Sequence, residues 1–260
     1  MAYTLEQIKN AFNTKADDNP FLFRKIIRPL SYYFTYISLR IGISTPNRAT
    51  VAGFICGCFS LIFIVLPEQN YLILGAGFYF IYYIFDHVDG NIARVSNQAT
   101  YFGKYLDGIV NAVINSLVLL AFSFRQYLVY NNPYYLYSGV IVFFVYILSC
   151  FVVTRTSFFN LWVKLDIKEG KVKESILLNE TNPLTSGKFT LKKMGNLAID
   201  LQTLAIFMSI FIGMNFWLYI MFLVPIGIWC GALIFVTMIR AYRQLNIHRY
   251  SKTDSRLNNK

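Results

Sequence analysis

Six apolar stretches, each about as long as a membrane-spanning helix, constrain this chain more than any other feature. They cover residues 47–66, 71–93, 104–124, 134–157, 196–213 and 216–239. A helix needs about 20 mostly apolar residues to cross a bilayer. The composition agrees, since 56% of the residues are hydrophobic and only 14% are charged, unlike an ordinary soluble domain. The sequence therefore predicts an all-α integral membrane protein with six transmembrane helices.

The basic residues indicate how these helices are oriented. The net charge is +11, which in a soluble protein would suggest nucleic acid. Here a basic face held against anionic lipid headgroups accounts for the charge more simply, so we expect no nucleic-acid partner. The short connections at 67–70, 125–133 and 214–215 contain a single basic residue, Arg125. The positive-inside rule then predicts that both termini and the long 158–195 loop are cytoplasmic, in a multi-pass protein of a bacterial inner membrane.

Three regions follow from this pattern. Residues 1–44 form a cytoplasmic segment whose apolar residues alternate with basic ones, which is typical of helices lying in the headgroup plane; the basic residues are Arg24, Lys25, Arg28 and Arg40. Residues 45–240 form the transmembrane domain, which begins at "STPNRAT", where Thr45 can cap the first span and Pro46 suits its first turn. Residues 241–260 form a basic cytoplasmic tail.

Carboxylates lie where the hydropathy pattern requires membrane helices. Asp86 and Asp89 are three residues apart at the end of the second span, and Asp107 and Asn111 are four apart at the start of the third, so each pair shares a helix face. The short connection "VSNQAT" would bring the two faces together at the cytoplasmic boundary. An ionisable residue in a membrane helix is costly unless it is paired, hydrated or bound to metal. Clustered carboxylate oxygens favour Mg²⁺ or Mn²⁺, ions that bridge phosphate oxygens.

The acidic cluster is also compatible with two roles that need no bound metal. The aspartates can pair with Arg94 and Lys104 in a structural salt-bridge network, or they can form a cation or proton pathway in a transporter. His87 lies between two of the carboxylates but points in another direction on the helix, which favours a packing or headgroup contact. The four cysteines lie in apolar stretches and are interpreted as small buried residues rather than metal ligands; they are Cys56, Cys58, Cys150 and Cys230.

The spacing of the polar residues resembles a known signature. The pattern Asp86-x2-Asp89-Gly90-x2-Ala93-Arg94-x8-Gly103-x3-Asp107-x3-Asn111 is similar to that of the CDP-alcohol phosphotransferase (CDP-alcohol phosphatidyltransferase) family, whose last position is an aspartate. Seven of the eight motif positions agree over 26 residues. The family's Thr-Pro-Asn-x-x-Thr segment is also matched, by Thr45, Pro46, Asn47 and Thr50. The resemblance extends over residues 45 to about 240.

The resemblance implies a homodimeric six-helix enzyme of phospholipid or lipid-linked glycan synthesis. Such an enzyme moves a phosphoryl-alcohol or phosphatidyl group from a CDP-linked alcohol or CDP-diacylglycerol to a lipid or alcohol acceptor and releases CMP. It implies that Asp86, Asp89 and Asp107 hold Mg²⁺ or Mn²⁺. The implied nucleotide-binding residues are Gly90, Ala93, Arg94, Gly103, Asn47 and Thr50, although helix capping explains the last two equally well. Arg155, near the inner end of the fourth span, is an expected acceptor contact, with a helix-end anchor as the alternative.

Asn111 departs from the family pattern at the position taken as the catalytic base. An amide cannot accept the acceptor's proton, although its carbonyl oxygen can still contact a metal. Three hypotheses follow: another group or water takes the proton; the acceptor is already anionic and needs no base; or the chain binds nucleotide and metal without transfer. A cation-handling membrane protein remains the alternative from another class. The motif recognises only the CDP half of the donor, so the sequence does not identify the donor's alcohol or the acceptor.

Overall fold

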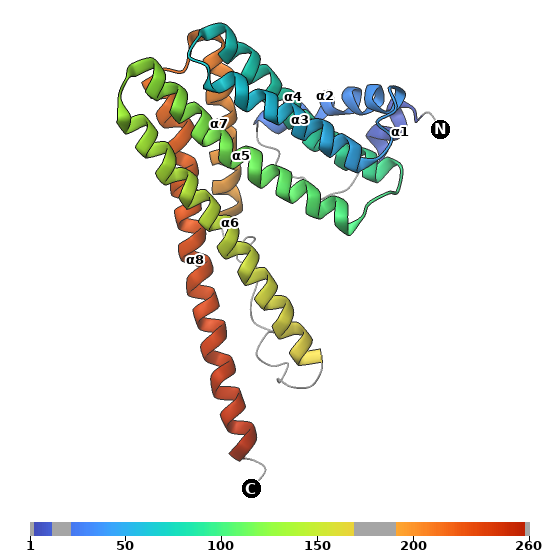
Figure 1. The fold of residues 1–260 in the computed structure, drawn as a ribbon. Coiled ribbons are helices and arrows are strands. Elements are labelled where there is room, and N and C mark those ends of the chain that lie inside the picture. The colour runs from blue at the N-terminus through green and yellow to red at the C-terminus, as the bar shows by residue number, and fades with distance from the viewer. Residues whose placement is uncertain (1–2, 12–21, 169–190, 258–260) are drawn as a thin grey trace. The chain divides into compact units, whose positions relative to one another are not determined.

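The computed structural model describes residues 3–11, 22–168 and 191–257 (Figure 1). Within these ranges every regular element is a helix: α1 (Leu5–Asn10), α2 (Leu22–Arg40), α3 (Pro46–Val65), α4 (Gln69–Val95), α5 (Tyr101–Tyr130), α6 (Pro133–Lys168), α7 (Leu191–Ile212) and α8 (Phe216–Leu257). Helices α3 to α8 are each long and apolar enough to cross a bilayer. The predicted all-α class and the six predicted spans are confirmed.

The helices are divided between two compact units. The first unit comprises Met1–Phe143 and Ile199–Leu223, and the second comprises Phe144–Ala198 and Val224–Lys260. The first unit contains α1 to α5 complete, and with them all the residues of the predicted acidic hairpin. In the second unit α7 and α8 approach closely at Gly195, where an added Cβ would lie 2.6 Å from the Trp229 ring.

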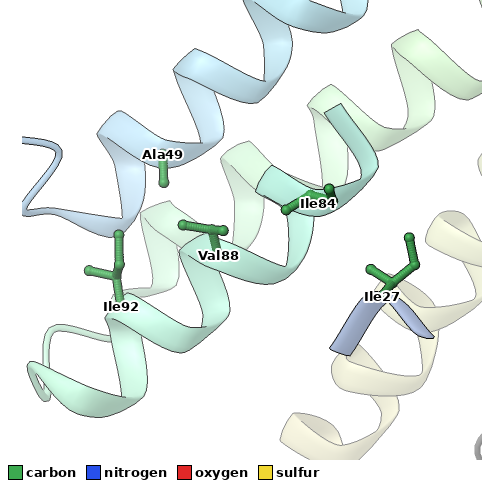
Figure 2. Close-up of a cluster of buried hydrophobic side chains, with 5 residues drawn as sticks. All are labelled: Ile27, Ala49, Ile84, Val88 and Ile92. Carbon is green, nitrogen blue, oxygen red and sulfur yellow. The ribbon is translucent and has the colours of Figure 1, made fainter. Parts of the chain in front are cut away.

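A buried apolar cluster in the first unit holds α4 against α2 and α3 (Figure 2). Ile84, Val88 and Ile92 are four residues apart and form one stripe along α4. They cluster with Ile27 of α2 and Ala49 of α3, and all five side chains are buried. Because this stripe is fixed in the core, the other faces of α4 and their polar side chains have a defined direction.

The predicted connection at 125–133 is wrong for most of its length. Helix α5 continues to Tyr130, and Arg125 lies inside it with a side chain only 4% exposed. Its guanidinium donates to the carbonyl oxygen of Leu66 and, at 3.2 Å, to that of Glu68. The Leu66 carbonyl lies just after the end of α3, and the Glu68 carbonyl, at the N-cap of α4, also accepts the Leu72 N–H at 3.3 Å. Arg125 is therefore a buried structural residue and not part of an outer loop.

Three other boundaries differ from those predicted. Helix α6 extends to Lys168 and α7 begins at Leu191, so both ends of the expected 158–195 loop are helical. Helix α8 reaches Leu257, which makes most of the predicted 241–260 tail helical. Hydropathy detects only the apolar part of a helix, whereas Lys, Arg and Gln continue it favourably beyond the membrane boundary. Residues 169–190 of the loop lie outside the described residues.

The expected N-terminal helical segment contains α1 and α2. Thr4 and Gln7 form a reciprocal capping box at the start of α1, with distances of 3.2 and 2.9 Å. The side chains of Arg24 and Lys25 lie outside the described part. At the start of α3, Pro46 occupies the first turn as predicted, but the Thr45 side chain makes no capping hydrogen bond.

Candidate active site

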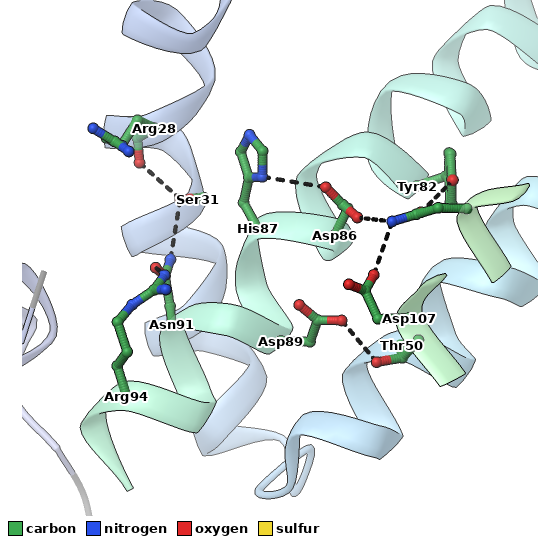
Figure 3. Close-up of polar contacts among 11 residues, drawn as sticks. Arg28, Ser31, Thr50, Tyr82, Asp86, His87, Asp89, Asn91, Arg94 and Asp107 are labelled. Carbon is green, nitrogen blue, oxygen red and sulfur yellow. Dashed lines mark hydrogen bonds and ion pairs between the residues drawn. The ribbon is translucent and has the colours of Figure 1, made fainter. Parts of the chain in front are cut away.

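The polar residues of α4 and α5 face each other across a short connection (Figure 3). Tyr82, Asp86 and Asp89 lie on one face of α4, at spacings of four and three residues. The Thr100 hydroxyl begins α5 by accepting the Gly103 backbone N–H at 3.0 Å. The chain thus reverses in a few residues, and α5 turns Asp107 toward the polar face of α4.

Asn111 joins the two helices through its amide. Its Nδ2 donates to Asp86 Oδ1 at 2.5 Å and to Asp107 Oδ1 at 2.8 Å. Its Oδ1 accepts a hydrogen bond from the Tyr82 hydroxyl at 2.6 Å. A neutral group therefore bridges two carboxylates that repel each other, and the Asn111 carbonyl suggested as a metal contact is held by Tyr82. Tyr82 was missed in the sequence, where its only signal was its place four residues before Asp86.

Asp89 is the most enclosed of the three aspartates, with 8% of the residue exposed. The hydroxyl of Thr50 on α3 donates to Asp89 Oδ2 at 2.7 Å. The same hydroxyl lies 3.2 Å from the Pro46 carbonyl oxygen in the first turn of α3. Thr50 thus fixes the rotamer of Asp89, a role that helix capping alone does not explain.

His87 contacts the acidic group as well as packing beside it. Its Nδ1 lies 3.4 Å from Asp86 Oδ2, and its ring packs on Tyr83 with 5.2 Å between ring centroids. The packing contact agrees with the expectation from sequence. The contact with Asp86 is additional, and it follows from the rotation of the imidazole back toward the preceding residue.

A second polar network joins α4 to α2. The buried Asn91 donates through Nδ2 to Ser31 Oγ and Thr35 Oγ1, both at 3.1 Å. Its Oδ1 accepts from Arg94 Nη2 at 2.9 Å. This network sets the direction of the Arg94 side chain. Asn91 was also missed in the sequence, where a single amide in an apolar helix gave little indication of its partners.

Two cavities adjoin these residues. The α2 cavity has a volume of about 400 Å³ and the Gly103 cavity about 310 Å³. Both are lined by Asp89, Gly90, Arg94 and Asp107, which we call the shared wall. The α2 cavity is further lined by Arg28, Ser31, Asp86, His87, Asn91 and Asn111. The Gly103 cavity is further lined by Pro46, Thr50, Ala93, Ala99, Thr100, Gly103 and Lys104.

The residues expected to bind nucleotide gather at the Gly103 cavity. A Cβ at Gly103 would lie 2.9 Å from Asn47 Oδ1 and 3.1 Å from Thr100 Oγ1, so a side chain at this position would displace the Asn47 amide. Asn47 is therefore packed against Gly103. Lys104, considered in the sequence only as a salt-bridge partner, lines this cavity.

The carboxylates have the chemistry of a divalent-metal site. All three border the α2 cavity, and carboxylate oxygens are hard ligands suited to hard divalent ions. In the arrangement described here, no three His, Cys, Asp or Glu side chains of the described residues converge as a metal-binding group. The Asn111 amide and the Thr50 hydroxyl each engage carboxylate oxygens instead. The donor set fits a divalent ion.

Arg155 belongs to the second compact unit, and its contact with Phe158 lies within that unit. It is exposed on α6, and its Cζ lies 5.9 Å from the centroid of the Phe158 ring. That contact suits the helix-end anchor considered for it. Its role toward an acceptor stays a prediction.

The described residues thus form an all-helical domain with six candidate membrane spans and with aspartates on a helical hairpin that border two adjoining cavities. The model of the CDP-alcohol phosphatidyltransferase family matches residues 43–229, and the chain belongs to this family. The predicted family and enzyme class are thereby confirmed. Members transfer a phosphatidyl or phosphoryl-alcohol group from a CDP-linked donor, and they generally use a divalent metal.

The fold is shared with a solved enzyme structure. It is similar to the crystal structure of Mycobacterium tuberculosis phosphatidylinositol phosphate synthase (PgsA1) with CDP-DAG bound, with a TM-score of 0.51 and 15% sequence identity. The match covers 85% of this chain and 94% of that one. Comparison with curated protein sequences gives no significant match.

Proposed function

We propose that this chain binds the diphosphate of a CDP-linked donor at the shared wall and transfers the donor's phosphoryl-alcohol group to an acceptor. The observation that carries the proposal is that Asp86, Asp89 and Asp107, from two helices, all line the α2 cavity. Asp89 and Asp107 border both cavities, so a diphosphate at this wall is accessible from each side.

The Gly103 cavity suits the nucleotide. Its lining includes Gly90, Ala93 and Gly103, whose small side chains leave room beside the helix backbones. Arg94 and Lys104 place positive charge there, which favours phosphate groups. Thr50 holds Asp89 in place, and Asn47 supports the cavity through its contact with Gly103.

The transfer requires one bond to form and one to break. The acceptor oxygen bonds to the phosphorus that carries the alcohol, the bond from this phosphorus to the bridging oxygen breaks, and CMP leaves with the electron pair. Asp86, Asp89 and Asp107 would hold Mg²⁺ or Mn²⁺, which when bound neutralises charge on the phosphate oxygens. A hydroxyl acceptor must also lose its proton.

Asn111 cannot receive that proton, and in this site it has a different task. Its amide donates to both Asp86 and Asp107 and so joins the two carboxylates. We propose an active enzyme in which another group or water takes the proton, or in which the acceptor is anionic. A third possibility is that the chain binds nucleotide without transferring any group. The CMP-binding measurement described below distinguishes this possibility from the two active enzymes.

The arrangement in the membrane belongs to the same proposal. The connections at 66–68, 131–132 and 213–215 contain no Lys or Arg. This supports an orientation with both termini and the acidic hairpin in the cytoplasm, as in a bacterial inner membrane. We also propose a homodimer, an interfacial 1–44 segment, a 45–240 catalytic domain and an acceptor contact by Arg155.

The test is release of CMP by the purified protein from a panel of CDP-alcohols and CDP-diacylglycerol, with Mg²⁺ or Mn²⁺. We expect release with one donor, and we expect Asp89→Asn to lower its rate on the order of a hundredfold, as for loss of a group that stabilises transition-state charge. The matched control is Glu68→Gln, an equivalent change at the N-cap of α4.

Binding of radiolabelled CMP, with and without a chelator, is measured in parallel. Ion-dependent binding without product would show a non-transferring family member. The absence of both binding and release would overturn the proposal.

A further inference from the structure

Two tyrosine–asparagine pairs join α4 to α5, about one helical turn apart. The Tyr82 hydroxyl donates to Asn111 Oδ1 at 2.6 Å, and the Tyr79 hydroxyl donates to Asn115 Oδ1 at 3.1 Å. Both tyrosines are buried, and their ring centroids are 5.6 Å apart. The two pairs therefore have the same chemistry and similar burial, and they differ in what the asparagine contacts next.

The pair at Tyr82 continues to two aspartates (Figure 3). Asn111 Nδ2 donates to Asp86 Oδ1 at 2.5 Å and to Asp107 Oδ1 at 2.8 Å. Hydrogen bonds thus run from the Tyr82 hydroxyl through the amide to one carboxylate on each helix, and we call these four residues the hydroxyl–amide chain. Within the described ranges, the Asn115 amide has no such continuation to a carboxylate.

The carboxylates fix the direction of every hydrogen bond in this chain. An ionised carboxylate accepts and does not donate, so the amide must present its N–H groups to Asp86 and Asp107. Its carbonyl oxygen then meets Tyr82, and the phenol hydroxyl supplies the donor that this oxygen needs. Donation to an amide carbonyl also polarises the amide, which strengthens the N–H donors at its other end.

The hydroxyl–amide chain ends on two of the three proposed ion ligands. A carboxylate oxygen has more than one lone pair, so it can accept from the amide and contact a cation as well. Hydrogen bonds of this kind orient ligating side chains, and residues that contact only the ligands affect metal affinity strongly. Because the chain links a ligand on α4 to one on α5, it fixes the two carboxylates relative to each other.

We propose that Tyr82 is a positioning residue for the divalent ion, because through Asn111 it holds Asp86 and Asp107 in the orientation that binds Mg²⁺ or Mn²⁺. This inference rests on the proposed function, since it concerns the same ion site. It gives Asn111 a task in ion binding, although its amide cannot act as a base. It also adds to the site a residue that lies outside the family signature.

The test compares Tyr82→Phe with Tyr79→Phe in the full-length protein. Each change keeps a buried ring and removes one hydroxyl that donates to an asparagine of α5, so the two variants are matched. Binding of Mn²⁺, with and without CMP, is followed by the electron paramagnetic resonance signal of the free ion. We expect Tyr82→Phe to weaken binding roughly tenfold, at the lower end of such effects, and Tyr79→Phe to bind like the unmodified protein.

Two further measurements separate positioning from a general loss of structure. At saturating Mn²⁺, we expect Tyr82→Phe to regain the CMP affinity of the unmodified protein, which a loosened fold would not do. In an Asn111→Ala background the hydroxyl–amide chain is already broken, so Tyr82→Phe should cause no additional loss of Mn²⁺ affinity.

Three results would overturn the positioning role of Tyr82. The first is equal Mn²⁺ affinity of Tyr82→Phe and Tyr79→Phe, and the second is a further loss of affinity in the double variant. The third is tighter binding by Tyr82→Phe, because the amide would then compete with the ion for the carboxylates. Failure of the unmodified protein to bind Mn²⁺ in either condition would remove the proposed function instead.

Discussion

At the scale of single residues, Asn111 shows how one amide changes an acidic site. A carboxylate in its place could not donate to Asp86 and Asp107, and three negative groups would then lie together. The amide satisfies both aspartates and is itself held by the buried Tyr82. The amide therefore lowers the electrostatic repulsion within the hairpin, and an aspartate at position 111 would raise it.

Asn111→Asp should increase the repulsion among the carboxylates and with it the dependence of the site on a cation. We expect a lower melting temperature in the presence of chelator, a larger stabilisation by Mg²⁺ or Mn²⁺, and transfer to neutral hydroxyl acceptors that is faster by roughly a hundredfold, as a general base contributes. The control is Asn115→Asp, one turn further along α5, where Oδ1 accepts from the Tyr79 hydroxyl at 3.1 Å. Thermal unfolding and radiolabelled transfer measure the effects. Equal ion dependence in the two variants would contradict this role of the amide.

The sequence predicted the residues that carry charge in the site and missed those that orient them. The aspartates stand out because carboxylates are rare in membrane helices. Tyr82 and Asn91 do not stand out, because tyrosines and amides are common near membrane boundaries and their partners come from α5 and α2. Only the packing of these helices on α4 reveals their function.

At the scale of helices, hydropathy located every span but not the ends. It placed Arg125 in a loop because it assumes that charge lies outside the membrane, whereas the guanidinium is satisfied by carbonyl groups after α3. The long polar extensions of α6 and α8 were missed for the related reason that a helix does not stop where its apolar residues do. Local hydrogen bonding decides these boundaries.

The close contact of α3 and α5 can be tested with a pair of glycines on one helix. In Gly103→Ala the new methyl group would lie 2.9 Å from Asn47 Oδ1 and 3.1 Å from Thr100 Oγ1, so these side chains must move, and the methyl group itself narrows the Gly103 cavity. We expect CMP affinity to fall roughly tenfold, as for a typical destabilising contact of about 1 kcal/mol or more. Gly108→Ala on α5 meets no atom within 4 Å and is the control. Equal CMP affinities for the two variants would argue against nucleotide binding in this cavity.

At the scale of the whole molecule, the sequence determines the number of crossings better than the grouping of the helices. The two compact units divide α6, α7 and α8 within their lengths, at residues where the hydropathy pattern shows no break. Such a division depends on contacts between segments distant in sequence. The predicted orientation, in contrast, follows from the charges in the connections. Because Arg125 lies inside α5, the connections on the predicted outer side contain no Lys or Arg, and the difference in basic residues between the two sides becomes larger.

Reporter fusions test this orientation. The six candidate spans among the described helices, an even number, would place both termini on the same side, and the positive-inside rule predicts that this side is cytoplasmic. In a bacterial host we expect a fluorescent protein at the C-terminus to fluoresce, and alkaline phosphatase inserted between Asn131 and Asn132 to be active. The reversed pair of results would show the opposite orientation and place the acidic hairpin on the outer face.

The shared wall also bears on how stable a bound donor is toward hydrolysis before the acceptor binds. With the donor bound as proposed, its reactive phosphorus would face a space that water can fill until an acceptor arrives, and a base placed there would promote hydrolysis as readily as synthesis. An amide at that point gives water no such help. Asn111 would thereby protect the bound donor from hydrolysis when the acceptor is scarce.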